Sequence, residues 1–324
     1  MLLPVFAMHI PDGFLSIPVA AVGWLLLIAM IALALRQTRQ QLGERQIPLM
    51  GILAAFVFAA QMINFPVAGG TSGHLLGGAL IAILLGPWAT VLVMTCVLGV
   101  QAVVFQDGGL LAIGFNSFNM GVIAAFVGYA CYQLIGRLAG SSRSSQLVGA
   151  AVGAWISVEI AALATALELA ISNTSPLSVA LPAMAGVHAL IGIGEALITV
   201  AALAFIQQTR PDLLNAAAPA QARGSAWIAT GLLIALAITF ASPLADPNPD
   251  GLERVAEDHG FLAVAQAAPY SLLPDYTVPF IADQTVSTIA AGIIGTLTVA
   301  GISYGVARLA ESRRLRDVSA TKSS

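Results

Sequence analysis

Nine apolar runs, separated by charged, glycine and proline residues, dominate the pattern along the chain. Runs of about 20 apolar residues are long enough to cross a membrane as helices, and the polar breaks mark where each helix ends. The run 75–85 is too short to cross alone, so we expect a tilted or broken segment packed against protein. The pattern predicts helices over 18–35, 48–65, 75–85, 88–105, 118–138, 146–171, 182–206, 226–242 and 285–307.

Composition agrees with this pattern. Of the 324 residues, 58% are hydrophobic and 9% are charged, whereas soluble domains carry roughly 25% charged residues. The predicted fold class is therefore an all-α polytopic membrane protein with about nine spans. The net charge of −3 gives no indication of nucleic-acid binding, and Cys96 and Cys131 lie within apolar runs, where we expect them to be small buried hydrophobes.

A polar segment divides the chain. Residues 209–225 are rich in polar and small residues and read as a cytoplasmic linker. The predicted units are a transmembrane domain over 8–208, this linker, a helix–loop–helix domain over 226–308 and a basic cytoplasmic tail over 309–324.

Cationic residues predict the orientation in the membrane, because they are enriched in cytoplasmic loops. With nine spans and an outer N-terminus, the cations after spans 1, 5, 7 and 9 all face the cytoplasm, and only Arg254 lies outside. The four histidines and most carboxylates then lie at the outer face, which favours cation binding there. The cytoplasmic cations are Arg36, Arg39, Arg45, Arg137, Arg143, Arg210, Arg223, Arg308, Arg313, Arg314, Arg316 and Lys322.

The run 8–16 (MHIPDGFLS) carries the strongest chemical signal. If the chain begins at Met8, the amine of Met8, the amide nitrogen of His9 and the His9 imidazole are three nitrogens that can hold one ion. Nitrogen donors in a plane suit tetragonal Ni(II) or Cu(II). Residues 1–7 leave two alternatives that free the amine: Met8 is the true start, or the seven residues are cleaved. If they stay, the amine ligand is lost.

Several stretches carry a family resemblance. The run 8–16 closely resembles the N-terminal signature of CbiM/NikM proteins, the substrate-binding membrane components of nickel and cobalt energy-coupling-factor transporters. The stretches 68–74, 105–109, 116–120 and 188–195 fit the same family, over 8–208 and with a seven-helix fold. The stretch 249–261 (PDGLERVAEDHGF) resembles the small NikN/CbiN-like companion component, fused here in one chain with two further helices.

The resemblance implies a site and a docking face. The N-terminal loop would plug into a pocket where Met8, His9 and His74 hold the ion. Asp107, Asn116, Asn119, His188 and Glu195 are candidates for supporting roles; for Asp107 a structural Asp-Gly turn carries equal weight. His188 and Glu195 lie about 10.5 Å apart on one helix, too far to share an ion, and a buried hydrogen-bonded network is the other interpretation.

Ala55 and Ala59 would dock a coupling partner through close helix packing, although most such pairs serve internal packing.

These expectations add up to a function. The chain is predicted to capture Ni²⁺ or Co²⁺ outside a cytoplasmic membrane, with a transmembrane coupling protein and two ATP-binding-cassette ATPases as partners. It has no GxxxxGK[ST] loop, so ATP hydrolysis is expected in the partners. No permanent cofactor and no enzymatic activity are predicted. The sequence does not separate nickel from cobalt. The acidic loop around His259 is expected to assist loading, not to supply a pocket ligand.

Two alternatives stay open. One is a proton-coupled secondary transporter that uses Glu159, Glu168 or Glu195, because carboxylates within spans mark proton or ion pathways. The other is an intramembrane enzyme built on His188 and a carboxylate, which no nucleophile motif accompanies.

Overall fold

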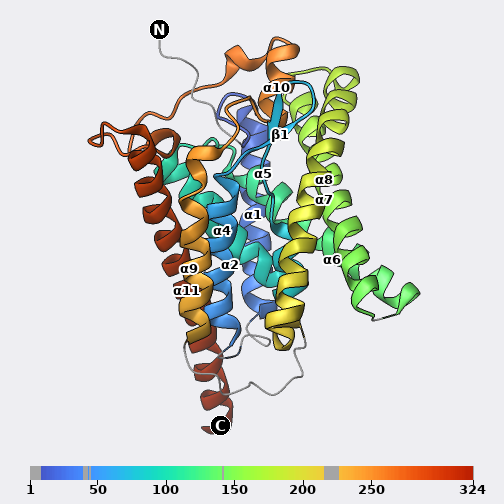
Figure 1. The fold of residues 1–324 in the computed structure, drawn as a ribbon, viewed down its shortest axis with the longest axis vertical. Helices are drawn as coiled ribbons and strands as arrows, with labels where there is room; N and C mark the ends of the chain where they lie inside the picture. Colours follow the sequence, from blue (N-terminus) through green and yellow to red (C-terminus); the bar gives the residue numbers. More distant parts are fainter. Residues whose placement is uncertain (1–8, 39–42, 44, 141, 215–225, 324) are drawn as a thin grey trace.

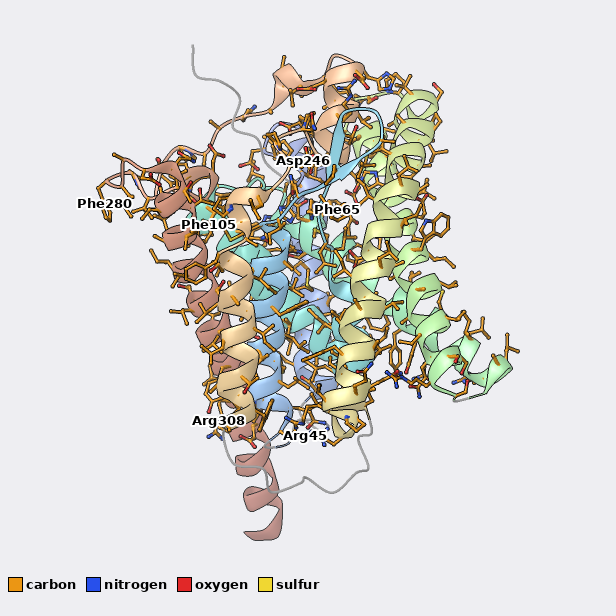
Figure 2. The ribbon with its side chains drawn as sticks, viewed as in Figure 1. Arg45, Phe65, Phe105, Asp246, Phe280 and Arg308 are labelled. Carbon is orange, nitrogen blue, oxygen red and sulfur yellow. The ribbon has the colours of Figure 1, made fainter. Side chains whose placement is uncertain are left out.

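The computed structural model describes residues 9–38, 43, 45–140, 142–214 and 226–323, and only the backbone of 313–323. Its long helices run side by side, with short elements gathered at one end (Figure 1). We call that end, which holds β1 and α10, the outer end. Arg45 and Arg308 lie at the opposite end from Asp246 and Phe280 (Figure 2).

Seven helical stretches are long and apolar enough to cross a membrane: Ile17–Thr38, Pro87–Phe105, Ile113–Ala139, Arg143–Ile171, Leu177–Thr209, Ala226–Leu244 and Gln284–Ser312. They contain α1 (Ile17–Thr38), α4 (Pro87–Val100), α6 (Ala124–Ala139), α7 (Arg143–Ile171), α8 (Leu177–Thr209), α9 (Ala226–Thr239) and α11 (Gln284–Ser323). Each of the nine predicted runs contains a helix. The chain is thus an all-helical membrane protein with seven candidate spans.

The other two predicted spans are shorter than expected. Helix α2 (Gln46–Gln61) has 16 residues and α3 (Gly78–Leu85) has 8. The predicted helix 48–65 was wrong at its outer end, because the chain leaves α2 at Gln61 and enters a hairpin. The hairpin pairs β1 (Phe65–Val67) with β2 (Thr71–Gly73) around a turn at Gly69 and Gly70, both with positive φ. Strands of three residues carry too little alternation to be predicted.

Two long helices contain π-helical turns near the outer end. The turn η1 (Gln101–Phe105) extends α4, and η2 (Phe118–Ile123) joins α5 (Ile113–Ser117) to α6. Such turns are frequent at functional sites. The chain between η1 and α5 holds Asp107, so η1 directly precedes the segment that carries this carboxylate, and η2 follows α5 on its other side.

Small residues let the membrane helices approach closely. A Cβ on Gly128 of α6 would lie 2.6 Å from the Cβ of Ala79, and one on Gly153 of α7 would lie 2.5 Å from the carbonyl oxygen of Gly128. Large apolar side chains instead face outward from α1 and α8, such as Leu25 and Leu197. An apolar exterior over a tightly packed interior is what a lipid solvent favours.

The C-terminal part packs on the rest of the chain. Helices α9 and α11 lie along α2, and Ala55 and Ala59 of α2 are fully buried. The described part of the chain therefore leaves no exposed surface at this predicted docking pair. At the outer end, α10 (Gly251–Asp258) lies against α8 and β2. The turns η3 (Pro211–Leu214), η4 (Ser242–Leu244), η5 (Leu262–Val264) and η6 (Pro274–Tyr276) complete the described elements.

Candidate metal site

The N-terminal loop lies inside the outer end of the bundle, held through its backbone. The side chain of Asn116 on α5 accepts from the amide of Ile10 (3.0 Å) and donates to the carbonyl of the same residue (3.0 Å). The amide of Gly109 also donates to that carbonyl (2.9 Å). Asn116 thus pairs with Ile10 as a neighbouring strand would, and it fixes the residue next to His9.

The Pro11-Asp12-Gly13 stretch fastens this loop to two other segments. The Asp12 carboxylate accepts from the amides of Leu110 (3.0 Å) and Leu111 (2.8 Å), and its carbonyl accepts from the amide of Gln266 (2.7 Å). Gly13 has φ +92°, and a Cβ there would lie 2.1 Å from the carbonyl oxygen of Val264. The loop is therefore clamped between the chain after Asp107 and the C-terminal segment around η5.

His9 is 4% exposed, and its two ring nitrogens have different surroundings. Nδ1 lies 2.9 Å from Oδ1 of Asp107. An ionised carboxylate only accepts, so Nδ1–H donates and Nε2 carries the lone pair. Among the described residues, this buried Nε2 has no hydrogen-bond partner. An imidazole that donates one N–H to a carboxylate and leaves the other nitrogen open has the arrangement of a metal ligand.

Asp107 is held on both of its oxygens. Oδ1 accepts from His9, and Oδ2 accepts from the hydroxyl of Tyr276 at 2.5 Å. Burial raises the pKa of the Asp107 carboxyl, but the adjacent His9 imidazole and the two hydrogen bonds outweigh that effect and leave the pKa below its usual range. Burial and the charge of Asp107 raise the pKa of Tyr276 well above its usual value, so the phenol stays protonated and donates.

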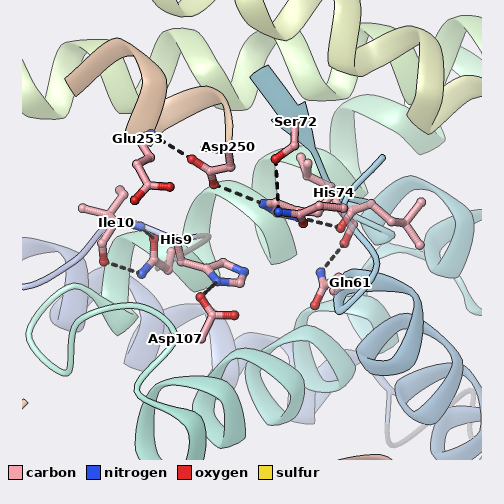
Figure 3. A network of polar contacts seen from close by, with 12 residues as sticks. His9, Ile10, Gln61, Ser72, His74, Asp107, Asp250 and Glu253 are labelled. Carbon is pink, nitrogen blue, oxygen red and sulfur yellow. Dashed lines mark hydrogen bonds and ion pairs between the residues drawn. The ribbon is translucent and has the colours of Figure 1, made fainter. Parts of the chain in front are cut away.

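His74 faces His9 from the other side (Figure 3). The two ring centroids lie 5.3 Å apart, with 45° between the ring planes. Nδ1 of His74 donates to the carbonyl of Leu75 (3.0 Å), and Nε2 lies 3.8 Å from Oδ2 of Asp250. The other oxygen of Asp250 caps α10 by accepting from the amide of Glu253 (2.8 Å). Burial first, and the charge of Asp107 next, raise the pKa of Asp250 to about 7.

Glu195 supports the segment that carries His74. Its two carboxylate oxygens accept from the amides of Leu76 (2.6 Å) and Gly77 (2.9 Å). Gln61 donates to the carbonyl of Leu76 (3.0 Å). Glu195 is fully buried. It therefore holds the backbone behind His74 and lies outside the lining of the cavity described next.

Both imidazoles line a small cavity of about 70 Å³. That volume holds an ion with a few water molecules. Within the described part of the chain, no three His, Cys, Asp or Glu side chains lie close enough together to hold a metal ion, so an ion here needs a further donor. The polar residues that line the cavity are His9, His74, Asn116, Asn119, Thr165, His188 and Asp250.

Two further predicted residues line this cavity, His188 on α8 and Asn119 on η2. His188 donates through Nδ1 to the carbonyl of Met184 (2.8 Å). Asn119 donates to Glu168 (3.0 Å) and Thr165 (3.1 Å), which fixes its amide group. Both residues line the same cavity as the two imidazoles.

The predicted three-nitrogen chelate stays a prediction, and the orientation of the His9 ring bears on it. A ring that joins the metal, the amide nitrogen and the side chain of one histidine closes through Nδ1, and Nδ1 of His9 faces Asp107. To form the chelate, the imidazole has to turn about its Cβ–Cγ bond. Met8 lies outside the described residues.

Sequence reasoning missed the parts that the C-terminal segment contributes. Asp250 lies beside His74, and Tyr276 donates to Asp107. Each pair is separated by about 170 positions along the chain. The pattern of Asp250 followed by Glu253 signals a helix N-cap, which the structure shows, but nothing in the sequence places that cap beside His74. His259 follows α10 and is exposed, away from the cavity lining.

Two family profiles match the chain. Residues 9–213 match the family described as the cobalt uptake substrate-specific transmembrane region, CbiM. Residues 225–312 match the PDGLE domain.

Individual relatives agree with this pairing. The putative fused nickel transport protein NikMN of Archaeoglobus fulgidus is 37% identical over 308 residues, covering 94% of this chain and 100% of the relative. The cobalt transport protein CbiM of Sorangium cellulosum is 33% identical over 213 residues, covering 64% of this chain and 95% of the relative.

A solved structure described as a transition metal transporter is 38% identical and covers 62% of this chain and 92% of its own, with a TM-score of 0.55. The chain therefore belongs to the CbiM family, as a substrate-specific transmembrane region for nickel or cobalt transport fused to a C-terminal PDGLE domain.

Proposed function

We propose that this chain captures Ni²⁺ or Co²⁺ at its outer end and that His9 and His74 bind the ion through imidazole nitrogens. The proposal rests on two buried imidazoles, 5.3 Å apart, that border one cavity. It is supported by the His9 nitrogen that has no partner among the described residues. Imidazole ligands suit both metals, and the choice between nickel and cobalt stays open.

The remaining donors come from the start of the N-terminal loop. The amine of Met8 is proposed as a third nitrogen, with the His9 amide joining once the imidazole has turned. Because the two imidazoles and the amine must be deprotonated to bind, acid should release the metal. Asp107 and Asn116 hold the loop, while Asn119, His188 and Glu195 support the surrounding walls.

The proposed orientation places the metal site outside the cytoplasmic membrane and the C-terminus in the cytoplasm. Arg45 and Arg308 lie at the end opposite the site (Figure 2), and cations favour the cytoplasmic side. Nine crossings require α2 and α3 to serve as short spans packed against protein. The proposed division is a metal-binding domain over 8–208, a linker over 209–225, a PDGLE domain over 226–308 and a tail over 309–324.

Transport itself is proposed to depend on partner subunits. A transmembrane coupling protein would relay the motion driven by two ATP-binding-cassette ATPases, as in energy-coupling-factor transporters. Docking through Ala55 and Ala59 requires the helices packed around α2, among them α9 and α11, to move, because both alanines are buried. Leucine at either position that left partner assembly and transport unchanged would contradict docking at this face.

The proton-coupled alternative is less well supported at two of its three carboxylates. Both carboxyl oxygens of Glu195 accept from backbone amides, and Glu168 accepts from Asn119. Neither carboxylate is therefore placed as a mobile proton carrier. An uncoupler separates the two: it should abolish proton-coupled uptake at once but leave ATP-driven uptake by the assembled transporter intact.

The direct test is a nickel titration of the purified full-length chain, with intact mass and N-terminal sequencing of the same sample. We expect one ion per chain, lost in His9→Ala and His74→Ala. His259→Ala is the matched control, since it removes an exposed imidazole at the same end and should leave equilibrium binding unchanged. One ion bound by His9→Ala and His74→Ala as tightly as by the wild type would refute the site.

A further inference from the structure

A second cavity lies at the end of the bundle opposite the candidate metal site. Its volume is about 710 Å³, about ten times that of the cavity beside the two histidines. Helix ends surround it: α1 contributes its last residue, Thr38, α2 contributes its first residue, Gln46, and the turn between α3 and α4 contributes Gly86. A space of this size holds a small organic ligand and is far larger than the voids that a packed interior leaves.

The polar part of this lining comes mainly from one face of α6. Tyr129, Tyr132, Gln133 and Arg137 all line the cavity, and their spacings of three and four residues place them on the same side of the helix. Arg137 is the one charged side chain among the lining residues that the structure describes. The polar groups therefore favour an anion, and the guanidinium of an arginine suits a phosphate because its N–H groups form a fork.

The charge of Arg137 is not used by the described part of the chain. Arg45 and Arg210 both pair with Asp212, and Arg308 pairs with Glu311, whereas Arg137 forms no ion pair with any described residue. Its place in the last turn of α6 suits a cation. The helix end still supplies no carboxylate, so the N–H groups of the guanidinium can bind an anion from outside the chain.

The rest of the lining is apolar. It includes residues of α3, the first turn of α4 and η3, namely Ile83, Leu84, Leu85, Ala89, Leu213 and Leu214. At this end, the ribbon of α6 lies apart from that of α2 (Figure 1). Two leucines of the same turns of α6, Leu134 and Leu138, are 55% and 78% exposed, as expected of side chains that contact lipid tails. The cavity is therefore bordered by a helix that faces the membrane.

A ligand that satisfies both parts of the lining needs an anionic head and an apolar tail. Phospholipids with a net negative charge have both. Basic pockets between transmembrane helices on the cytoplasmic side bind such headgroups. Arg137 lies in the last turn of its helix, at the depth where headgroups are expected when the metal site faces outside.

We propose that this cavity binds one anionic phospholipid of the cytoplasmic leaflet, with Arg137 on its phosphate and the apolar residues of α3 and η3 along the start of an acyl chain. The site is separate from the two histidines and does not depend on metal binding. A lipid bound here would contact α6, η3 and the start of α2 together, so it should also stabilise the folded chain.

The test measures lipid retention by the purified full-length chain, stripped of lipid in a neutral detergent. Native mass spectrometry compares added dioleoyl phosphatidylglycerol with dioleoyl phosphatidylcholine. We expect one phosphatidylglycerol per chain and about tenfold lower affinity in Arg137→Gln, because charge-assisted hydrogen bonds to the phosphate are lost. Arg308→Gln is the matched control, since Arg308 lies at the same end but outside the cavity lining.

A second variant fills the cavity. Gly136 lines it, and a Cβ there would have no neighbour within 4 Å, so Gly136→Leu should occupy the space of the lipid without displacing the backbone. Gly305→Leu on α11 is its control, because a Cβ there is equally free and Gly305 is not in the lining. Leucine favours a helix over glycine, so both variants should fold. Phosphatidylglycerol should raise the unfolding midpoint of the wild type and Gly305→Leu, but not of Gly136→Leu.

Several outcomes would overturn the proposal. Equal retention of phosphatidylglycerol by the wild type, Arg137→Gln and Gly136→Leu would place the lipid elsewhere. Equal retention of phosphatidylcholine and phosphatidylglycerol by the wild type would exclude recognition of an anionic head. Glycerol phosphate that binds as tightly as phosphatidylglycerol would reveal a site for a dissolved phosphate without a lipid. A failure of the wild type to bind nickel or cobalt would overturn the proposed function alone.

Discussion

The two histidines at the cavity are held in different ways. The ring of His9 is oriented by side chains, with Asp107 on Nδ1 and Tyr276 behind it. The ring of His74 is bonded to the backbone carbonyl of Leu75, next to amides that bond to Glu195. Orientation of His9 therefore depends on single side-chain atoms, whereas orientation of His74 also depends on the fold of a backbone segment, with the Asp250 carboxylate beside its other ring nitrogen.

This difference predicts where mutations act. A change on the His9 side should alter metal binding with little effect on folding, since the bonds involved orient one ring. A change on the His74 side should alter stability first and binding as a consequence, since the bonds involved hold a buried chain segment. The following variants test that contrast.

Glu195→Ala should have the largest effect. It leaves the amides of Leu76 and Gly77 without their carboxyl acceptor in a fully buried place, which destabilises the fold by about 3 kcal/mol. Unfolding in detergent measures the change. Glu195→Gln, which keeps one acceptor oxygen, should lose less. Equal stability of Glu195→Ala and the wild type would remove the distinction between the two histidines.

Asp107→Asn should act on binding more than on folding. The amide keeps one acceptor for His9 but offers N–H where Tyr276 donates, so the ring loses its fixed partner. We expect nickel affinity to fall by about 10- to 100-fold, with the unfolding midpoint near that of the wild type. Titration and thermal unfolding on the same preparation decide this. A large loss of stability with unchanged affinity would reverse the assignment.

Asp250 should give a smaller effect that separates two roles. Asp250→Ala removes the cap of α10 and is expected to lower stability by about 1 kcal/mol. Asp250→Ser keeps a capping oxygen but removes the carboxylate 3.8 Å from His74. If the carboxylate helps to bind the ion, the serine variant keeps stability and loses affinity; if Asp250 only caps the helix, the serine variant matches the wild type in both measurements.

The smallest effect concerns the dependence of stability on pH. Burial first, and the charge of Asp250 next, raise the pKa of Glu253 to about 8, from an unfolded value near 4. The folded state then binds this proton more tightly than the unfolded state, so stability is greatest below about pH 4 and is lost as the pH rises toward 8. Glu253→Gln should flatten the fall of the unfolding midpoint between pH 5 and pH 8. The same slope in both proteins would exclude Glu253 as its source.

The helices could be predicted from sequence because each is a local property of one apolar run. The segment 146–171, for example, lies in α7 over Arg143–Ile171. Its apolar run is too long for a strand, so a helix was the expected element. The outer hairpin could not be predicted, because β1 and β2 are three residues each and β2 is bonded to Pro249, far along the chain.

The residues around the site also divide into those that the sequence indicated and those that depend on contacts between distant segments. Family resemblance pointed to His9, His74 and Asp107 as neighbours in function, and the structure brings them together, while their role as metal ligands stays a prediction. Tyr276 carried no signal, since its pairing with Asp107 spans 169 positions and depends on the left-handed turn at Asp275. The sequence left open whether Glu195 supports the site or belongs to a buried network. Its bonds to the amides of Leu76 and Gly77 place it behind His74.

The most direct test of the central claim is X-ray absorption of the nickel-loaded full-length protein, because scattering from imidazole rings counts the histidines on the metal. We expect two imidazoles per nickel in the wild type and one in His74→Ala loaded at high nickel concentration. A wild-type spectrum without imidazole scattering, or one unchanged in both His9→Ala and His74→Ala, would contradict a site built on these two histidines.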